Sequence, residues 1–452
     1  MKNKFDTSFL LSENDFLNQS DYTANKSCLV NSLESVENIN DQSNGLMRLL
    51  LHSIRYEQST EVSNSIYKYI TLFGYDIPQS GNQLHRDLSL QHLRLLENIG
   101  EDSIDLAFQS RKQEPLDETS YYLRILAPFM LCDEIKDWEF YKWCALEIIN
   151  YSLENGLNEI TPYGCLGLSR YMITKYEDMH LAKDYAQVAL SEIEKSNNKR
   201  IINNFYSDYA FIILPWLEEL SVCLEMINEK FSLILKSNDN YLKGKNVKRY
   251  YQMLLFSGVN KSEALRKSHH DLENVAFDEK PIVTEILQLY QLSKMTERVN
   301  LEKVIMLIDK SPEIYEGTLL HPSLLVMKAV YINNQKESRE GELRKIYDRF
   351  KYWAGYSPKL FNTWKHFVEA EWRINRDEVE LAKELYSKAL KESSSNKIDL
   401  KCLVALRRLA VFSEIKKEDS DLPQFYTEAK DVYKDFGDEK AFEALINRFK
   451  SA

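Results

Sequence analysis

Glycine and proline are scarce in this sequence, with 13 and 10 residues in a chain of 452. Average usage would give roughly 12% for the two together, more than twice what is present. Sheet proteins need glycine at turns, bulges and phosphate-binding loops, and they place proline at strand edges and corners. The shortage therefore argues against sandwiches, barrels and dinucleotide-binding α/β domains, and it favours long helices joined by short connections.

Long apolar runs are missing as well. The most apolar window, residues 209–227, is interrupted by Pro215 and three glutamates, so it is typical of a buried helix pair and not of a membrane span. Residues 1–14 contain no continuous apolar stretch of the kind that a signal peptide needs. We therefore expect no membrane partner and a cytoplasmic location.

Metal-binding and redox motifs are also lacking. The six cysteines show no CxxC or cysteine–histidine spacing, and several lie in apolar helical runs. We expect most of them to be small buried residues in a reducing compartment. The histidines are few and scattered: His85 and His92 could share a helix face, and His269 and His270 are adjacent. Because no H-E-x-x-H motif accompanies these histidines, we expect them to be structural, and we predict no metal site.

Basic residues are fewer than acidic residues. The chain has 58 lysines and arginines against 69 acidic residues, a net charge of −11. This charge repels polyanions, so we expect no nucleic-acid partner. Residues 236–249 concentrate five basic side chains against one acid. The spacing is typical of a solvated loop and helix start, and we favour that interpretation over a phosphate site.

Nucleotide-binding and nucleophile motifs fail at the decisive positions. Gly244-Lys245 has Asp239 where a phosphate-binding loop needs glycine, and Asn246 where it needs a hydroxyl. Asp435-Phe436-Gly437 is not accompanied by the other kinase motifs, and we predict that a helix ends at Gly437. No G-x-G-x-x-G or G-x-S-x-G pattern occurs. We predict no catalytic residue and no cofactor, and we expect Gly164 and Gly167 to serve close helix packing.

The chain divides into a polar segment, residues 1–43, and a body, residues 44–452, with nearly unbroken helical periodicity. We expect the first to be a flexible or loosely docked arm and the second to be one continuous helical array. Thr161-Pro162 and Ser357-Pro358 place a capping hydroxyl before a proline, which predicts helix starts.

Two segments, residues 181–190 and 381–390, share L-A-K at the start and A-L at the end. Each has apolar residues at i, i+1, i+4, i+5, i+8 and i+9, which predicts one buried stripe on a helix. Ala382-x3-Tyr386-x2-Ala389 resembles the second helix of a tetratricopeptide repeat, with Ala370 at the small position of the first helix and Arg373 where an aromatic residue is usual. Tyr426-x2-Ala429 is a weaker copy. Stacked helical hairpins account for three copies better than unrelated helices do.

Aromatic residues make up 12% of the chain, with tyrosine foremost. Filling the gaps between hairpins is the favoured use, and the alternative, that a fraction of them lines a concave partner-binding groove, stays open.

The order of several motifs resembles the helical-repeat region of large bacterial hybrid signalling proteins, over about residues 45–450. The matching segments are Trp353-Ala354-x3-Pro358-x2-Phe361, Glu369-Ala370-Glu371-x-Arg373, Ala382-x2-Leu385-Tyr386-x2-Ala389 and Tyr433-x2-Phe436-Gly437-x2-Lys440-x4-Leu445. Upstream, Leu72-x-Gly74-x3-Pro78, Tyr163-Gly164, Ala182 and Pro215-Trp216 follow in the same order. In that family the region lies between a predicted ATPase and GAF or histidine-kinase modules, often behind a serine/threonine kinase. This chain has none of those catalytic modules, so the resemblance implies only a helical module that positions partners or senses for them.

We therefore expect an all-α, right-handed α-solenoid of tetratricopeptide-like hairpins that acts as a non-catalytic interaction or regulatory module in bacterial signalling. The partner would be a protein, with a kinase or an ATPase as candidates, bound as a segment on the concave face. Two alternatives stay open: a peptide or small-molecule sensor, and an enzyme or host-directed effector whose site is assembled in space.

Overall fold

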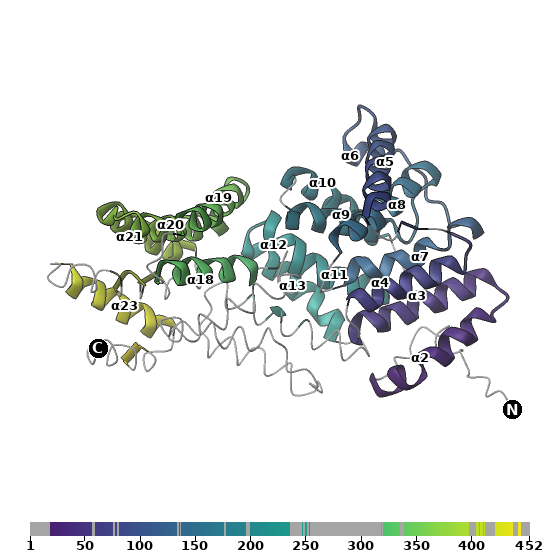
Figure 1. Cartoon of the computed structure of the whole chain (residues 1–452), viewed down its shortest axis with the longest axis horizontal. Helices are drawn as coiled ribbons and strands as arrows, with labels where there is room; N and C mark the ends of the chain where they lie inside the picture. Colours follow the sequence, from purple (N-terminus) through teal and green to yellow (C-terminus); the bar gives the residue numbers. More distant parts are fainter. Residues whose placement is uncertain are drawn as a thin grey trace. The chain divides into compact units, whose positions relative to one another are not determined.

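The computed structural model is helical through the residues that it describes (Figure 1). These residues are 19–56, 59–75, 77–78, 81–132, 135, 137–175, 178–195, 199–235, 246, 249–250, 253, 318, 320–334, 339–396, 404–405, 407–409, 411, 421–436 and 442–443. Helices and turns account for nearly all of them, and one isolated parallel bridge joins Gln113 to Leu157. The all-α prediction is confirmed for this part of the chain. In the same ranges, no helix is both long enough and apolar enough to cross a membrane.

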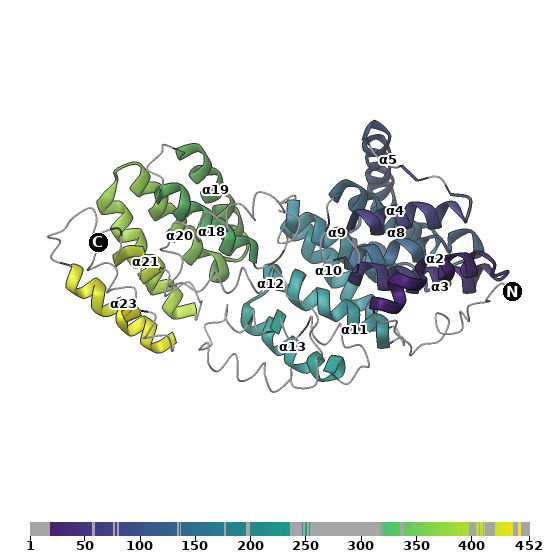
Figure 2. The same ribbon diagram turned by 60° about the horizontal axis from the view of Figure 1, so that its bottom comes forward.

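Two compact units divide the chain, Met1–Ile213 and Leu214–Ala452, whereas the sequence predicts one array over residues 44–452. The first unit contains α2 (Gln19–Glu34), α3 (Ile39–Tyr56), α4 (Ser59–Thr71), α5 (Gly81–Ile99), α6 (Ile104–Gln109), η1 (Glu118–Ser120), α7 (Leu123–Leu126), η2 (Ala127–Leu131), α8 (Trp138–Asn155), α9 (Thr161–Lys175), α10 (Met179–Ile193), α11 (Lys199–Asp208) and η3 (Tyr209–Ile213). The second contains α12 (Leu214–Leu217), α13 (Leu220–Leu235), α18 (Leu320–Asn334), α19 (Glu340–Tyr356), α20 (Pro358–Asn375), α21 (Val379–Asn396) and α23 (Leu422–Phe436) (Figure 2).

The N-terminal segment differs from the sequence prediction of an arm over residues 1–43. Residues 19–34 form α2, and α3 begins at Ile39, so no element boundary falls at residue 43. Leu29, Val30 and Leu33 of α2 are buried. A Cβ atom on Gly45 of α3 would lie 2.4 Å from Leu33 Cδ2, so the absence of a side chain there lets α2 and α3 approach closely. Residues 1–18 lie outside the described part of the chain.

The core of the first unit is a layer in which α9 packs between α8 and α10. Gly164 and Gly167 of α9 are the points of closest approach. A Cβ on Gly164 would lie 2.7 Å from Ile148 Cγ2 of α8, and one on Gly167 would lie 2.2 Å from Met130 Sδ. On the other side of α9, Ser169 donates a hydrogen bond of 2.7 Å to the carbonyl of Ala182 in α10. The prediction that these two glycines serve close helix packing is confirmed.

The second unit contains a comparable layer, in which α20 packs between α19 and α21. Small residues again mark the contact between helices, since Ala370, Ala382 and Ala389 are completely buried. Elsewhere in this layer, Trp353 of α19 and Phe361 of α20 pack against each other, with ring centroids 5.3 Å apart. Aromatic side chains thus pack between helices that small residues hold close together.

The repeated segments of α10 and α21 have the same burial profile. Four equivalent positions are buried in both helices: Ala182, Tyr185, Ala186 and Ala189 in α10, and Ala382, Leu385, Tyr386 and Ala389 in α21. The prediction is wrong for the first position of the stripe, because Leu181 and Leu381 are 38% and 39% exposed. The first and last positions lie at the two edges of a stripe about 180° wide, where the neighbouring helix no longer covers them.

The proline-marked helix starts are confirmed, but the predicted capping by hydroxyl groups is wrong. Pro162 and Pro358 lie within the first two positions of α9 and α20. Ser357 makes no side-chain capping bond. The Thr161 hydroxyl instead accepts a hydrogen bond of 3.0 Å from the backbone N–H of Asn158, which precedes the helix. At the C-terminal end of a helix, Gly74 follows α4 with φ of 76°, as expected for a residue that ends a helix.

Replacing Gly164 with alanine should destabilise the first unit by about 1–3 kcal/mol, because the new methyl group meets the β-branched Ile148 and must push α8 away. Urea unfolding followed by circular dichroism would measure the loss, and amide hydrogen exchange would place it in α8 and α9. The matched control is Gly355→Ala in α19, where a Cβ meets nothing within 4 Å and stability should stay equal or rise slightly. Equal unfolding curves for wild type and Gly164→Ala would contradict the close contact.

Candidate functional site

Four of the six cysteines are in chemically protected positions, and the side chains of Cys28 and Cys402 lie outside the described part of the chain. Cys132, Cys144, Cys165 and Cys223 are buried free thiols, which confirms the sequence prediction for these four. Burial raises the pKa of the Cys144 and Cys165 thiols well above the usual value, and it raises that of Cys223 to about 12. Since the thiolate is the nucleophile, none of these three is suited to attack a substrate at neutral pH.

The other residues that could suggest a reaction do not converge in the described part of the chain. His85 pairs with Glu139 of α8, with 3.3 Å between Nδ1 and Oε2, and both side chains are largely exposed. No group of three metal-ligating side chains occurs among the described residues. Asp435 and Phe436 belong to the last turn of α23. Gly437, Gly244-Lys245 and His269-His270 lie outside the described residues.

Among the described carboxylates, Glu371 in α20 accepts four hydrogen bonds, and its side chain is completely buried. Its Oε1 atom accepts hydrogen bonds from the Tyr386 hydroxyl at 2.6 Å and from Arg407 Nε at 2.7 Å. Its Oε2 atom accepts from Asn333 Nδ2 at 2.8 Å and from Arg407 Nη2 at 3.0 Å. Both oxygens are therefore occupied by groups from α18, α21 and the segment around residue 407.

This arrangement stabilises the carboxylate instead of exposing it to a substrate. The bidentate arginine supplies the opposite charge that a buried carboxylate needs. Burial, followed by the neighbouring Glu371 charge, raises the pKa of Tyr386 far above its usual value, so the phenol stays protonated and donates. Glu371 thus connects helices of the second unit and has no lone pair directed toward a cleft.

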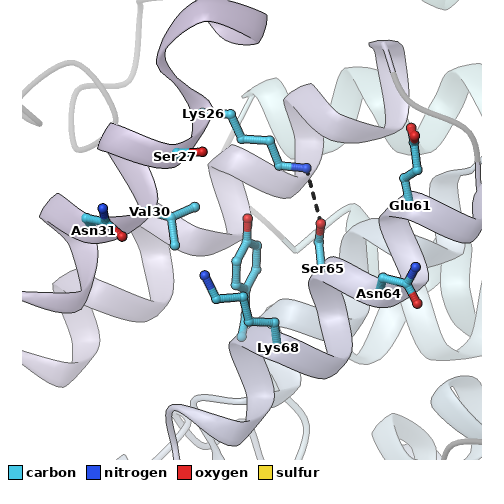
Figure 3. Close-up of a pocket in the computed structure, with 9 residues that line it drawn as sticks. Lys26, Ser27, Val30, Asn31, Glu61, Asn64, Ser65 and Lys68 are labelled. Atoms are coloured by element: carbon cyan, nitrogen blue, oxygen red, sulfur yellow. Dashed lines mark hydrogen bonds between the residues drawn. The ribbon is translucent and has the colours of Figure 1, made fainter.

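A pocket of about 490 Å³ lies between α2 and α4 in the first unit (Figure 3). We call it the α2–α4 pocket. Its lining residues are Lys26, Ser27, Val30, Asn31, Glu61, Asn64, Ser65, Lys68 and Tyr69. They follow helical spacing on each helix, at positions 26, 27, 30 and 31 of α2 and 61, 64, 65, 68 and 69 of α4, so each helix turns one face toward the pocket.

Polar side chains line much of this pocket, and two lysines against one glutamate, Glu61, give the lining a small excess of positive charge. Lys26 extends from α2 across the pocket to Ser65 of α4, with 3.3 Å between Nζ and Oγ (Figure 3). Lys68 is 3.5 Å from Glu34 at the pocket's border, and the lysine side chain is 58% exposed. Hydroxyl and amide groups surround the two ammonium groups, while Val30 and the buried ring of Tyr69 supply apolar surface. Such a set suits an anionic group with a short apolar stem.

The sequence alone does not predict this pocket, because α2 falls within residues 1–43, which the sequence predicts to be an arm. The available signal was the spacing of polar residues at i, i+3 or i+4 and i+7 on α4, which marks one helix face. That signal is common to many solvated helices. Only the packing of α2 against α3 brings the two lysine-bearing faces together.

Comparison with protein-family models, with curated proteins and with solved structures finds no match to this chain.

Replacing Glu371 with glutamine should lower stability by about 3–5 kcal/mol, because Arg407 then keeps a charge in a largely buried position without its partner. The control is Glu340→Gln, which breaks an exposed pair with Arg376 and should cost less than about 1 kcal/mol. Adding Arg407→Met to Glu371→Gln should recover part of the loss in urea unfolding. If Glu371→Gln and Glu340→Gln unfold alike, the buried pair does not support the second unit.

The thiols of Cys144 and Cys165 should be alkylated by iodoacetamide at least about tenfold more slowly in the native protein than in the unfolded one. The cause is burial, which both blocks access and raises their pKa. Mass spectrometry of digested protein after timed alkylation measures each cysteine separately. Rapid native labelling of either residue would show that the α8–α9 core opens easily.

Proposed function

We propose that this chain is a non-catalytic protein-interaction module whose α2–α4 pocket receives an acidic segment of a partner protein. The observation that carries the proposal is the pair of lysines, Lys26 and Lys68, which line the pocket from facing helices. Two ammonium groups attract a carboxylate or phosphate, and the surrounding amides and hydroxyls can hold its other atoms by hydrogen bonds.

The charge of the whole chain makes this pocket selective. The net charge is −11, so an acidic segment is repelled by most of the surface and attracted only where basic side chains gather. A partner would therefore be directed to a local positive site, and the association should weaken as salt is added.

The helical hairpins support the same class of function. Within each unit, neighbouring helices pack closely through small residues, and α10 and α21 bury equivalent positions. On this basis we propose a right-handed, tetratricopeptide-like solenoid, an architecture that binds partner segments along an extended surface. The resemblance of residues 45–450 to the helical-repeat region of bacterial hybrid signalling proteins supports a cytoplasmic role in bacterial signalling, with a kinase or an ATPase as the partner.

A non-catalytic role is supported by how the buried reactive groups are used. Glu371 is saturated with structural hydrogen bonds, and the buried cysteines are held as thiols. These groups stabilise the helices and leave no poised acid, base or nucleophile among themselves.

A second candidate function is that of a small-molecule sensor. The volume of the α2–α4 pocket falls within the range of small-ligand sites, roughly 300–1,000 Å³. A small dicarboxylate or phosphate ester would use the same two lysines. In a thermal-shift screen, such anions should raise the unfolding temperature if the pocket is a sensor site, and an acidic peptide alone should do so if it is a docking site.

The variant Lys26→Glu/Lys68→Glu should weaken binding of a fluorescent hexaglutamate peptide at least about tenfold, because the pocket then repels the carboxylates. Fluorescence anisotropy measures the affinity, and raised salt should weaken the wild-type complex in the same assay. In lysate of the source organism, the partner captured by the wild-type chain should be lost by this variant.

The control for this experiment is Lys351→Glu/Lys388→Glu, which makes the same change in net charge at exposed positions of α19 and α21. This control should bind peptide and partner like the wild type, apart from a small general effect of charge. Equal weakening by both variants would refute the pocket as the binding site, and so would undiminished capture by the pocket variant.

A further inference from the structure

Helix α5 exposes a row of leucines. Leu90, Leu93 and Leu96 are 54%, 56% and 54% exposed, the three of them spaced at i, i+3 and i+6 on one helix. We call these three residues the leucine stripe. In Figures 1 and 2, α5 protrudes at the top of the first unit. Leu93 lies about 180° around the helix from the buried Leu84, so the stripe faces directly away from the core.

The opposite face of α5 packs against α8, and several polar groups take part in this contact. Gln91 donates to Glu147 at 2.5 Å, and Arg94 forms a bidentate pair with Glu154. The buried Asn150 donates to Gln91 at 2.7 Å. The hydrogen bond from Arg94 lowers the pKa of Glu154, which keeps this carboxylate charged. Leu84 and Leu95 are the α5 residues that are buried.

Like an ordinary surface helix, α5 buries leucines on one face, but the leucine stripe is a second apolar row on its exposed side. The leucine stripe contributes nothing to the attachment of α5. A contiguous apolar row on an exposed helix is typical of an interaction site, and its i, i+3 spacing suits another helix laid along it.

Exposed charges of opposite sign lie at the two ends of the stripe. Arg86 precedes it, and Glu97 and Glu101 follow it. Within the described ranges, none of these three side chains forms a recorded ion pair. Along the chain, this face of α5 is therefore first basic, then apolar, then acidic. When a second copy runs in the opposite direction, the basic end of each helix lies opposite the acidic end of the other.

We propose that two copies of this chain associate through antiparallel α5 helices, related by a twofold axis at Leu93. This register places Leu90 of one copy opposite Leu96 of the other and pairs the two Leu93 side chains. With a rise of 1.5 Å per residue, Arg86 then lies within about 4.5 Å along the axis of the partner helix's position 97, and Glu101 follows just beyond the end of that helix at Ile99. Both ends of the helix pair gain an attraction between opposite charges.

An antiparallel second copy fits the stripe better than a parallel second copy would. Parallel pairing would bring Arg86 against Arg86 and Glu97 against Glu97, which is repulsive at both ends. One helix pair buries less than a standard protein interface, so the dimer should be weak and concentration-dependent, with a dissociation constant of roughly 10–100 µM.

The first test concerns the apolar contact. In sedimentation velocity over a concentration series, the full-length chain should show a reversible monomer–dimer equilibrium. The variant Leu93→Asp should raise the dissociation constant more than about tenfold, because two carboxylates would meet at the axis. The control Leu381→Asp removes an exposed leucine of α21 and should leave the equilibrium unchanged. Circular dichroism confirms that both variants are folded.

The second test concerns direction and register. The variants Arg86→Glu and Glu97→Arg/Glu101→Arg should each dimerise at least about tenfold more weakly than the wild type, since each places like charges at both ends. Mixing the two variants should restore dimers at the wild-type concentration, because in the mixed pair each end again has opposite charges. Fluorescence energy transfer between differently labelled variants detects the mixed dimer.

Each outcome is decisive for the proposal. A wild-type chain that stays monomeric at its highest soluble concentration refutes self-association, and the stripe would then serve a different protein. Dimers that are unaffected by Leu93→Asp use another surface. Dimers that are lost by Leu93→Asp but not restored by mixing the charge variants would overturn the antiparallel register.

Discussion

Close contact between helices at glycine and alanine is the constraint on which the packing of both units depends. In the first unit Gly164 and Gly167 bring α9 against its neighbours, and in the second Ala370, Ala382 and Ala389 do the same for α20 and α21. A larger residue at such a point would separate the helices along their whole length, because a helix moves as a rigid rod. The large aromatic side chains then pack beside these contacts, in spaces whose width the small residues have set.

The periodicity of the sequence predicted much of this packing. The four central positions of the stripe in α10 and in α21 are buried as expected, since an amphipathic helix that is covered by one neighbour buries the middle of its apolar face. Leu181 and Leu381 could not be placed in the same way. Their exposure depends on how far the neighbouring helix extends around the stripe, which is a property of the tertiary structure.

The first helix and the pocket show a different limit of sequence reasoning. The buried positions of α2 are the adjacent Leu29 and Val30 and, after two polar residues, Leu33, and so short a set gives a weak pattern. What fixes α2 is the fit of Leu33 against Gly45, a contact between residues that are twelve positions apart and lie on separate helices. The lysines of the α2–α4 pocket depend on that contact. Similarly, nothing in the sequence distinguishes Glu371 from the many other carboxylates until Tyr386, Asn333 and Arg407 are brought around it.

The polar attachment of α5 has a consequence for the dynamics of the first unit. Side chains such as Gln91, Arg94 and Asn98 can exchange their partners on α8 for water at a small net cost per hydrogen bond. A helix that is attached mainly by apolar contacts would lose the hydrophobic contribution outright. These polar contacts therefore let α5 separate from α8 more readily than apolar contacts alone would, while the α8–α9–α10 core stays intact. Ionic strength, which screens the pairs of Arg94, would shift this local equilibrium.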